Sequence, residues 1–183
     1  MRALVLVQPG RVELQQRADP TPGPGEVLLK VEATTLCGTD LRIISGAKTA
    51  GVRPGVVMGH EIAGRVAALG DGVTGYNVGQ QATPSIVLSC NHCRTCLLGY
   101  EHLCENLRLI GYEIDGGLAD YWLIPRAAIE RGQLVKASAH LEPAQLALAE
   151  PISCCLNGMD NYRVEVGDVV VIVGAGPIGL IHL

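Results

Sequence analysis

Short runs of β-branched and leucine residues alternate with glycine- and proline-rich turns over the first two thirds of the chain. The stretch 19–25, DPTPGPG, is a rigid turn of this kind and separates two such runs. The runs predict short strands over residues 2–7, 27–33, 61–69, 79–83 and 119–124. Many short strands joined by glycine-rich turns predict a mainly β fold, a small and partly closed barrel.

The pattern changes after residue 141. Residues 143–150 and 152–159 are rich in Ala, Leu and other helix formers, with Pro151 between them as a kink or restart, and predict two short helices. Residues 169–173, VVVIV, form an uninterrupted apolar run, which is typical of a strand buried on both faces of a parallel sheet. We therefore expect two units, residues 1–160 and residues 161–183.

Composition limits the classes of function. With 183 residues, 48% of them hydrophobic, the chain can bury the core of one ordinary domain but not of two complete ones. A net charge of -4 and only 3% aromatic residues provide neither a basic surface for nucleic acid or anionic membranes nor stacking platforms for bases. The apolar opening at residues 3–7 is too short for a signal peptide or a membrane span. These features predict a soluble cytoplasmic protein.

Four of the seven cysteines lie within 15 residues and predict a metal site. Their thiolates could surround Zn²⁺ tetrahedrally, and they are Cys90, Cys93, Cys96 and Cys104. An iron–sulfur cluster of the bacterial type fits poorly, because position 100 is Tyr and no proline follows Cys104. His92 and His102 are alternative ligands, although four cysteines already complete the shell. Such a closed site would be structural.

A second group of possible ligands comes from three separate places. Cys37, His60, Glu61 and Glu150 combine a thiolate, an imidazole and two carboxylates, a mixture suited to catalytic zinc with an exchangeable position. Taken one by one, the same residues could be a small buried side chain, a loop histidine and solvated glutamates. The spacing alone does not show that they meet.

The motifs together resemble those of the medium-chain, zinc-dependent alcohol dehydrogenases over essentially the whole chain. They are CGTD at 37–40, GHExxGxV at 59–66, the four-cysteine segment and VGAGPIG at 173–179, in that order. The resemblance implies a chaperonin-10 (GroES)-like catalytic domain in residues 1–160. It also implies that residues 161–183 begin a Rossmann domain for NAD or NADP, which is cut off at its first strand and turn.

The resemblance also implies roles for single residues. Cys37 and His60 would bind the catalytic zinc, Glu150 would take the third protein-ligand position, and Glu61 would be an alternate or exchanging ligand. Asp40 would orient His60, and Thr39 would accept the proton of the substrate. A carboxylate at position 150 looks more like the branch that acts on polyols, sugars and secondary alcohols.

The glycines of the G-x-G-x-x-G turn, Gly174, Gly176 and Gly179, would bind the pyrophosphate of the dinucleotide. The acidic residue that reads the ribose would lie about 20 residues further on, beyond Leu183, so NAD and NADP are not distinguished. We expect reversible oxidation of a small alcohol, polyol or sugar-type substrate by the complete enzyme, and little activity from these 183 residues alone. A homo-oligomer is the assembly that the resemblance implies.

Two other functions fit parts of the sequence. The chain could be a stand-alone, non-catalytic zinc module, which metal content and cofactor binding would separate from a dehydrogenase. A zinc-free quinone reductase of the same superfamily is disfavoured, because it would need neither the cysteine segment nor the set at positions 37, 60 and 150. Cys154 and Cys155 are expected to be small buried residues on a helix.

Overall fold

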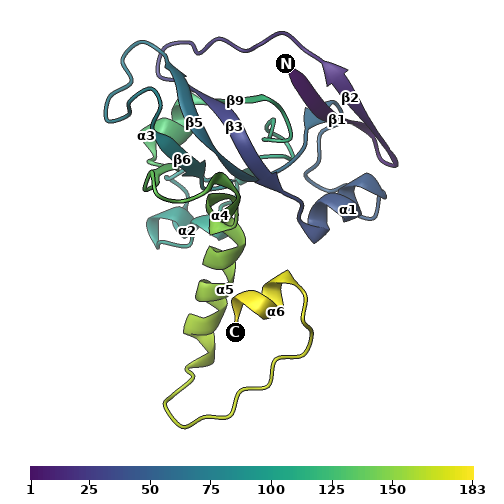
Figure 1. Cartoon of the computed structure of the whole chain (residues 1–183), viewed down its shortest axis with the longest axis vertical. Helices are drawn as coiled ribbons and strands as arrows, with labels where there is room; N and C mark the ends of the chain where they lie inside the picture. Colours follow the sequence, from purple (N-terminus) through teal and green to yellow (C-terminus); the bar gives the residue numbers. More distant parts are fainter.

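The computed structural model describes residues 1–183, and its centre is an antiparallel sheet of five strands in the order β10-β6-β5-β3-β9 (Figure 1). The strands are β3 (Val27–Thr35), β5 (Glu61–Leu69), β6 (Gln81–Pro84), β9 (Tyr121–Ile124) and β10 (Leu134–Lys136). The long pair β3 and β5 forms the middle, and both strands were expected within two residues at each end. The candidate metal site described below lies at the end of this pair where β3 finishes and β5 begins.

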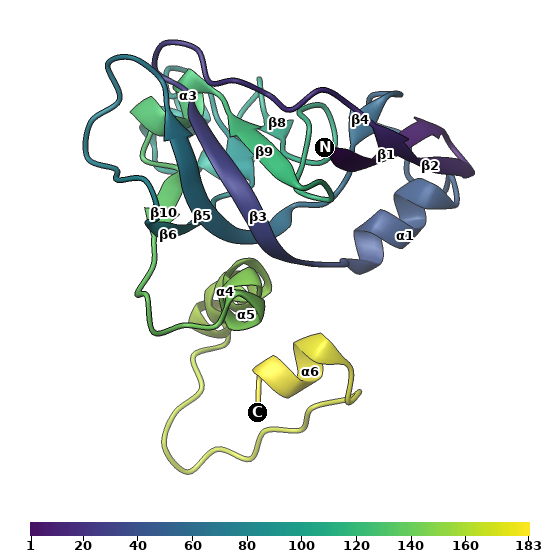
Figure 2. The same ribbon diagram turned by 45° about the horizontal axis from the view of Figure 1, so that its top comes forward.

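Two smaller sheets flank the centre (Figure 2). One has the order β2-β1-β4, and the other pairs two short strands, β7 with β8. Their bounds are β1 (Arg2–Gln8), β2 (Arg11–Gln16), β4 (Val56–Val57), β7 (Val87–Leu88) and β8 (Arg108–Leu109). The predicted mainly β fold is confirmed, with its strands divided among open sheets.

The main core lies on one face of the five-stranded sheet, where eleven buried apolar residues form one cluster. Trp122 is its largest member, and its indole N–H donates to the carbonyl of Asp115 at 2.7 Å, so the one polar atom of the ring is satisfied. A second cluster, which includes Leu6, Ile43 and Met58, joins the sheet that contains β1 to the helix at Gly38–Ile44.

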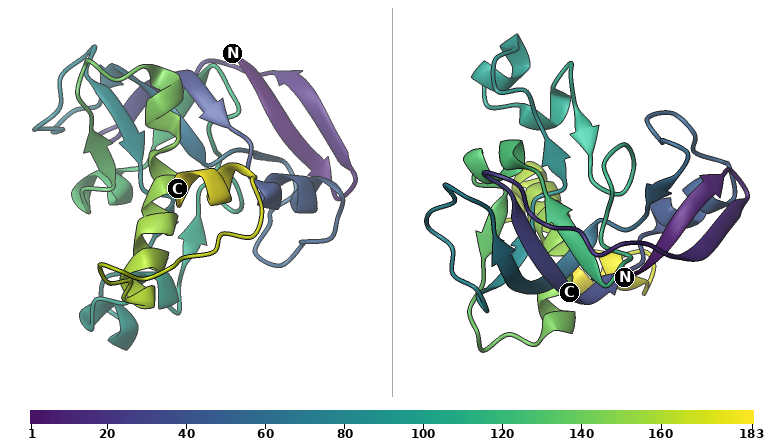
Figure 3. Two further views of the ribbon diagram at one scale, coloured as in Figure 1. Left: turned by 60° about the horizontal axis from the view of Figure 1, so that its bottom comes forward. Right: turned by 90° about the horizontal axis from the view of Figure 1, so that it is seen from above.

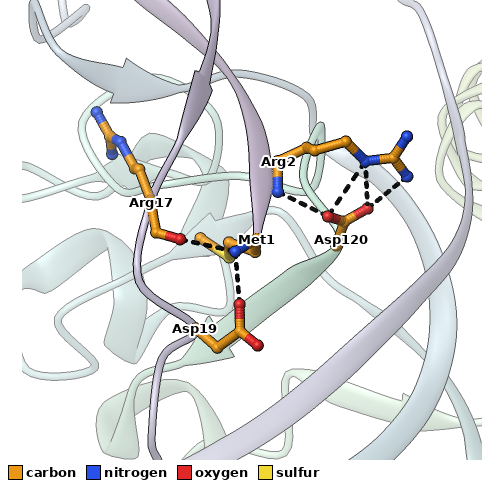
Figure 4. A network of polar contacts seen from close by, with 5 residues as sticks. All are labelled: Met1, Arg2, Arg17, Asp19 and Asp120. Carbon is orange, nitrogen blue, oxygen red and sulfur yellow. Dashed lines mark hydrogen bonds and ion pairs between the residues drawn. The ribbon is translucent and has the colours of Figure 1, made fainter.

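Ion pairs tie the beginning of the chain to distant segments (Figure 4). The ammonium of Met1 donates to the carbonyl of Arg17 at 2.6 Å and to the Asp19 carboxylate at 2.5 Å. Arg2 binds Asp120 through both its backbone N–H and its guanidinium, the latter at 2.8 Å. The Arg2–Asp120 contacts and the isolated bridge between Ala3 and Ala119 hold β1 beside the segment that leads into β9.

Short helices connect and cover the sheets. They are α1 (Gly38–Ile44), α2 (Arg94–Leu97), the 3₁₀ turn η1 (Glu101–Leu103), α3 (Arg126–Glu130), α4 (Pro143–Ala147), α5 (Ala149–Tyr162) and α6 (Pro177–Ile181). The break predicted at Pro151 is wrong, because it falls at Leu148 and Pro151 lies in the first turn of α5. A proline there breaks no helical hydrogen bond, since the first N–H groups of a helix have no partner within it.

The strand predicted over residues 169–173 is not formed. This segment is extended but unpaired, and Val169 and Val173 are more than nine-tenths exposed. The apolar run has the composition of a buried parallel strand but has no neighbouring strand in this chain, and a lone strand leaves its backbone groups without partners. After it the chain turns back, and α6 lies beside α5 (Figure 1). No helix in the structure combines the length and apolarity needed to cross a membrane.

Candidate metal centres

The four cysteines of the segment 90–104 converge at the end of a lobe that projects from the sheets, drawn in teal in Figure 3. All four sulfur atoms lie within 4.8 Å of one another. Three Sγ···Sγ distances are 3.4 Å for Cys93–Cys96, 3.9 Å for Cys93–Cys104 and 4.0 Å for Cys90–Cys96. Thiolates arranged tetrahedrally around zinc at about 2.3 Å would be roughly 3.8 Å apart. The cluster therefore has the dimensions of a zinc site, and the thiols are free rather than paired as disulfides.

Backbone N–H groups also point at these sulfur atoms. Those of Cys90 and Asn106 donate to Cys104 Sγ at 3.2 and 3.3 Å, and that of Cys93 donates to Cys90 Sγ at 3.3 Å. Asn91, with φ of 60°, makes the left-handed turn that brings Cys90 back towards Cys93. Such donors stabilise negative sulfur, as a metal–thiolate site requires.

Two of these thiols have large pKa shifts in opposite directions. A hydrogen bond from the Thr95 hydroxyl is the main cause that lowers the pKa of Cys93 to about 5, whereas desolvation raises the pKa of Cys96 to about 12. Neighbouring thiols cannot all ionise unless a cation compensates their charge. The donor set thus fits Zn²⁺. His92 is outside it and has Nδ1 2.8 Å from the Cys90 carbonyl, and His102 is likewise no member of the group.

The second group lies where β3 ends, α1 begins and β5 begins. Ligand atoms of Cys37, His60 and Glu61 lie within 4.8 Å of one another. Antiparallel pairing explains the convergence, because Thr35 and Glu61 are direct partners in the sheet. Cys37 lies two residues after Thr35, and His60 lies immediately before Glu61. The strands therefore deliver a thiol, an imidazole and a carboxylate to one point.

A capping box fixes the thiol. Cys37 is the N-cap of α1, and its sulfur accepts a hydrogen bond from the Thr39 N–H at 3.4 Å. The Asp40 carboxylate accepts in return from the Cys37 N–H at 2.9 Å. This reciprocal pair satisfies two free donors at the helix start and orients Cys37 and Asp40 together.

The histidine is placed by an unusual backbone at Gly59. This residue has φ of +88°, and a Cβ there would lie 2.6 Å from Leu118 Cγ. Gly111 and Gly116 also approach Gly59 so closely that a Cβ on either would lie within 3 Å of its carbonyl oxygen. The glycine before His60 is therefore a geometric requirement of the site.

Polar atoms around His60 are left without partners. Its Nδ1 lies 3.7 Å from Asp40 Oδ1, too far for a hydrogen bond, and both atoms are buried and unpaired. Burial is the main cause that raises the pKa of Asp40, and the His60 charge partly opposes it. Buried polar atoms of this kind point to a missing ligand, because a metal on the imidazole would strengthen donation from its other nitrogen to Asp40. The residues fit the catalytic metal that the sequence predicts.

Glu150 lies outside this close group but faces it from α5. Burial is the main cause that raises the pKa of Glu150, the His60 charge partly opposes this, and the Glu150 charge in turn raises the pKa of Tyr112. Cys154, one helical turn on, donates to Glu150 Oε1 at 3.4 Å. The expectation that Cys154 is buried is wrong, because it lies on the open side of α5, whereas Cys155 is buried as expected.

Two residues near the site were not found from the sequence. Tyr112 is buried, and its ring centre lies 5.4 Å from that of His60. Thr35 donates through Oγ1 to Glu61 Oε2. Neither residue belongs to a motif. The strand register brings Thr35 to Glu61, and the loop that contains Tyr112 brings its ring to His60.

The glycine-rich turn has the shape that its motif predicts. Gly174 has φ of +109°, Gly176 caps α6, and a Cβ on Gly179 would lie 2.0 Å from the Gly174 carbonyl oxygen. Nothing lies within 4 Å of a Cβ placed at Gly176. The turn is therefore tight and open on the side where a phosphate could approach.

Comparisons with known proteins agree with this geometry. The profile of the family described as "Alcohol dehydrogenase GroES-like domain" matches residues 23–134. L-Threonine 3-dehydrogenase of Xanthomonas euvesicatoria pv. vesicatoria (strain 85-10) is 40% identical over 99% of this chain and 52% of its own length. The enzyme of that name from Stenotrophomonas maltophilia (strain K279a) is 38% identical with the same coverage.

Solved structures give the same result. A structure from Sinorhizobium meliloti 1021, assigned as a zinc-binding dehydrogenase and bound to NADP, has a TM-score of 0.91 and 37% identity over 99% of this chain and 51% of its own. Galactitol-1-phosphate dehydrogenase from Escherichia coli has a TM-score of 0.87 and 28% identity, over 100% of this chain and 51% of its own. The chain thus spans about half the length of the relatives it matches. By its sequence profile and its fold, the chain belongs to the alcohol dehydrogenase GroES-like domain family.

Proposed function

We propose that this chain forms the zinc-binding, substrate-side part of an NAD(P)-dependent dehydrogenase that oxidises a secondary alcohol or polyol to a ketone. The observation that carries the proposal is the mixed donor group of Cys37, His60 and Glu61, which meets within 4.8 Å next to Thr39, whose backbone N–H donates to the Cys37 sulfur. A structural site would use four protein ligands, as the cysteine lobe does, whereas three protein ligands leave a position for a substrate.

The zinc, when bound, would act as a Lewis acid towards the alcohol oxygen. The chain itself would supply the groups that hold the metal and move the proton. Thr39, fixed by its N–H bond to the Cys37 sulfur, would accept the proton of the alcohol through its hydroxyl and release the proton of that hydroxyl towards solvent. Tyr112 lies beside His60, and since burial is the main cause that raises its pKa to about 12, the phenol stays protonated.

The substrate class rests on the second carboxylate and on the relatives. Glu150 faces the metal group from α5, in the position that the resemblance connects with polyol, sugar and secondary-alcohol enzymes. L-Threonine 3-dehydrogenase and 2R,3R-butanediol dehydrogenase are named for substrates whose reacting hydroxyl is secondary. We therefore propose a secondary alcohol as the substrate.

The dinucleotide would bind at the turn of Gly174, Gly176 and Gly179, where the backbone can approach a pyrophosphate. We also propose that residues 1–160 form the catalytic domain and that residues 161–183 belong to the cofactor domain. The helix α5 crosses this boundary and ends at Tyr162.

Metal content tests the proposal most directly. We would measure zinc per chain by elemental analysis after purification without added zinc or a metal-affinity tag, and compare the chain with Cys37→Ser. Two zinc ions falling to one would support both sites. One zinc ion, unaffected by the substitution, would contradict the catalytic site and favour the non-catalytic zinc module.

A further inference from the structure

One lysine lies near the proposed metal group and has no carboxylate partner. The ammonium of Lys48 is 5.6 Å from the centre of the Tyr112 ring, and the centre of that ring is 5.4 Å from that of His60. These two distances place the ammonium at most about 11 Å from the imidazole. A small molecule whose hydroxyl lies at the metal group could therefore reach the positive charge.

The backbone holds Lys48 in this place. Lys48 lies in the loop between α1 and β4 and is half-buried, and its N–H donates to the Arg42 carbonyl at 3.0 Å. Further along the same loop, the Arg53 N–H donates to the Tyr112 carbonyl at 2.9 Å. The loop is thus tied both to the end of α1 and to the tyrosine, so the ammonium and the ring are positioned together.

The Lys48 ammonium has unused donors. It donates to the Ala50 carbonyl at 3.3 Å, and none of the ion pairs in the structure includes it. Glu113, which follows Tyr112 in the sequence, accepts instead from the Leu109 N–H at 3.0 Å through its Oε2. Because an ammonium has three N–H donors, two of them stay free for an anion from outside the chain.

A second lysine makes the same contacts without a histidine nearby. The ammonium of Lys136 is 5.7 Å from the centre of the Tyr76 ring and donates to the Gly75 carbonyl at 3.1 Å. No histidine ring stacks on Tyr76. A lysine over a tyrosine is therefore an ordinary contact in this fold, and Lys48 differs because its tyrosine also lies beside His60.

We propose that Lys48 is a specificity-determining residue that selects alcohols with an anionic group, a carboxylate or a phosphate, close to the reacting hydroxyl. The hydroxyl would lie at the proposed metal group, and the anionic group would accept from the free donors of Lys48. This inference deepens the proposed function and rests on its zinc site. A neutral alcohol of the same size leaves the ammonium without a partner and binds less tightly.

Ligand binding tests the proposal without enzyme turnover. We would load the chain with Co²⁺ and follow the part of the thiolate-to-cobalt absorption that Cys37→Ser removes. Two pairs of probes contain a secondary hydroxyl and differ in charge: 3-hydroxybutyrate with 3-hydroxybutyramide, and propane-1,2-diol 1-phosphate with propane-1,2-diol. In at least one pair, we expect the anionic probe to bind about tenfold more tightly than the neutral one, because a hydrogen bond between charged groups at a half-buried position contributes more than an exposed ion pair.

Substitutions separate the charge from the fold of the loop. Lys48→Met removes the charge and keeps most of the length, so it should abolish the anionic preference and leave binding of the neutral probes unchanged. Lys48→Arg keeps the charge and should keep most of the preference. Lys136→Met is the matched control, because it removes a lysine with the same tyrosine contact, and it should change neither affinity.

The outcomes distinguish the role of Lys48 from the metal site. An anionic preference that is missing in the unchanged chain, or that persists in Lys48→Met, would overturn the role of Lys48. Equal losses for anionic and neutral probes in Lys48→Met would also overturn it, since they would show a structural role only. Absence of any cobalt signal that depends on Cys37 would overturn the proposed zinc site, and this inference with it.

Two further comparisons complete the test. The probe pair with the larger anionic preference shows whether the group selected is a carboxylate or a phosphate. Should Lys48→Met fail to fold, as far-ultraviolet circular dichroism would show, Lys48→Gln removes the charge with a polar side chain and decides the matter by the same criteria.

Discussion

Replacing Gly59 by alanine should damage both the fold and the metal site, and the size of the effect follows from the backbone. A non-glycine residue at a left-handed φ costs roughly 1–2 kcal/mol, and Gly59 has φ of +88°. The new methyl group would also lie 2.6 Å from Leu118 Cγ and 3.0 Å from the Leu118 nitrogen. Overpacking of a well-packed region costs about 1–3 kcal/mol more. The sum, about 2–5 kcal/mol, is a large part of the stability of an ordinary domain.

Gly72 supplies a matched control. It has φ of +77°, but nothing lies within 4 Å of an added Cβ, so Gly72→Ala carries the conformational cost without the collision. Urea unfolding followed by tryptophan fluorescence of Trp122 would give the free energy of unfolding of both variants. We expect Gly59→Ala to be less stable than Gly72→Ala by about 1–3 kcal/mol and to lose the metal that depends on Cys37. Equal stability of the two variants would refute the argument that close packing against Leu118 determines the position of His60.

Three further predictions concern pH, metal removal and the cofactor. Hydrogen bonds from Arg2 are the main cause that lowers the pKa of Asp120 to about 2, so its stabilising effect is complete above its ordinary pKa of 3.8 and is lost as the pH falls through 2. An NMR titration of Arg2→Gln should show a raised Asp120 pKa that stays below its ordinary value, because the backbone N–H of residue 2 still donates to the carboxylate, and an unchanged pKa would contradict this. A chelator should open residues 90–104 to proteolysis while β3 and β5 stay protected, because metal binding contributes to the folding of such a lobe; unchanged cleavage would argue against a structural metal. Because residues 169–173 are unpaired, fluorescence titration of the chain with NADH should show no saturable binding in the submillimolar range, and tight binding would refute this.

Local pattern predicted those elements whose local and tertiary preferences agree. Strand β5 was expected at its observed bounds, since glycine lies on both sides of an apolar run. The helix α1 was missed because its N-cap is Cys37, a residue that rarely caps helices, and the helix is only seven residues long. The strand predicted over residues 169–173 was wrong, because the composition of the run is that of a buried strand but no strand of this chain pairs with it.

The candidate site shows the same division. The cysteine lobe could be predicted from spacing alone, because its ligands are close in sequence. The group of Cys37, His60 and Glu61 required the resemblance to a family, since the register of β3 and β5 brings its members together. The contact of Thr35 with Glu61 is a consequence of that register and of one side-chain rotamer, and no motif encodes it.

The architecture gives the two carboxylates different freedom. Glu61 is the first residue of β5 and pairs with Thr35 of β3, so the central sheet holds its backbone. Glu150 is in the first turn of α5, a helix that contacts β5 but projects away from the sheets, and its only side-chain partner is an exposed thiol (Figure 1). A shift of α5 would therefore move Glu150 relative to His60 while leaving Glu61 in place. Because α6, which follows the glycine-rich turn, packs against α5, binding of a dinucleotide at that turn has a mechanical route to Glu150. On this reasoning a dinucleotide should change the cobalt spectrum of a complete enzyme that contains this chain, and Glu150→Gln should abolish that change while Glu61→Gln should not.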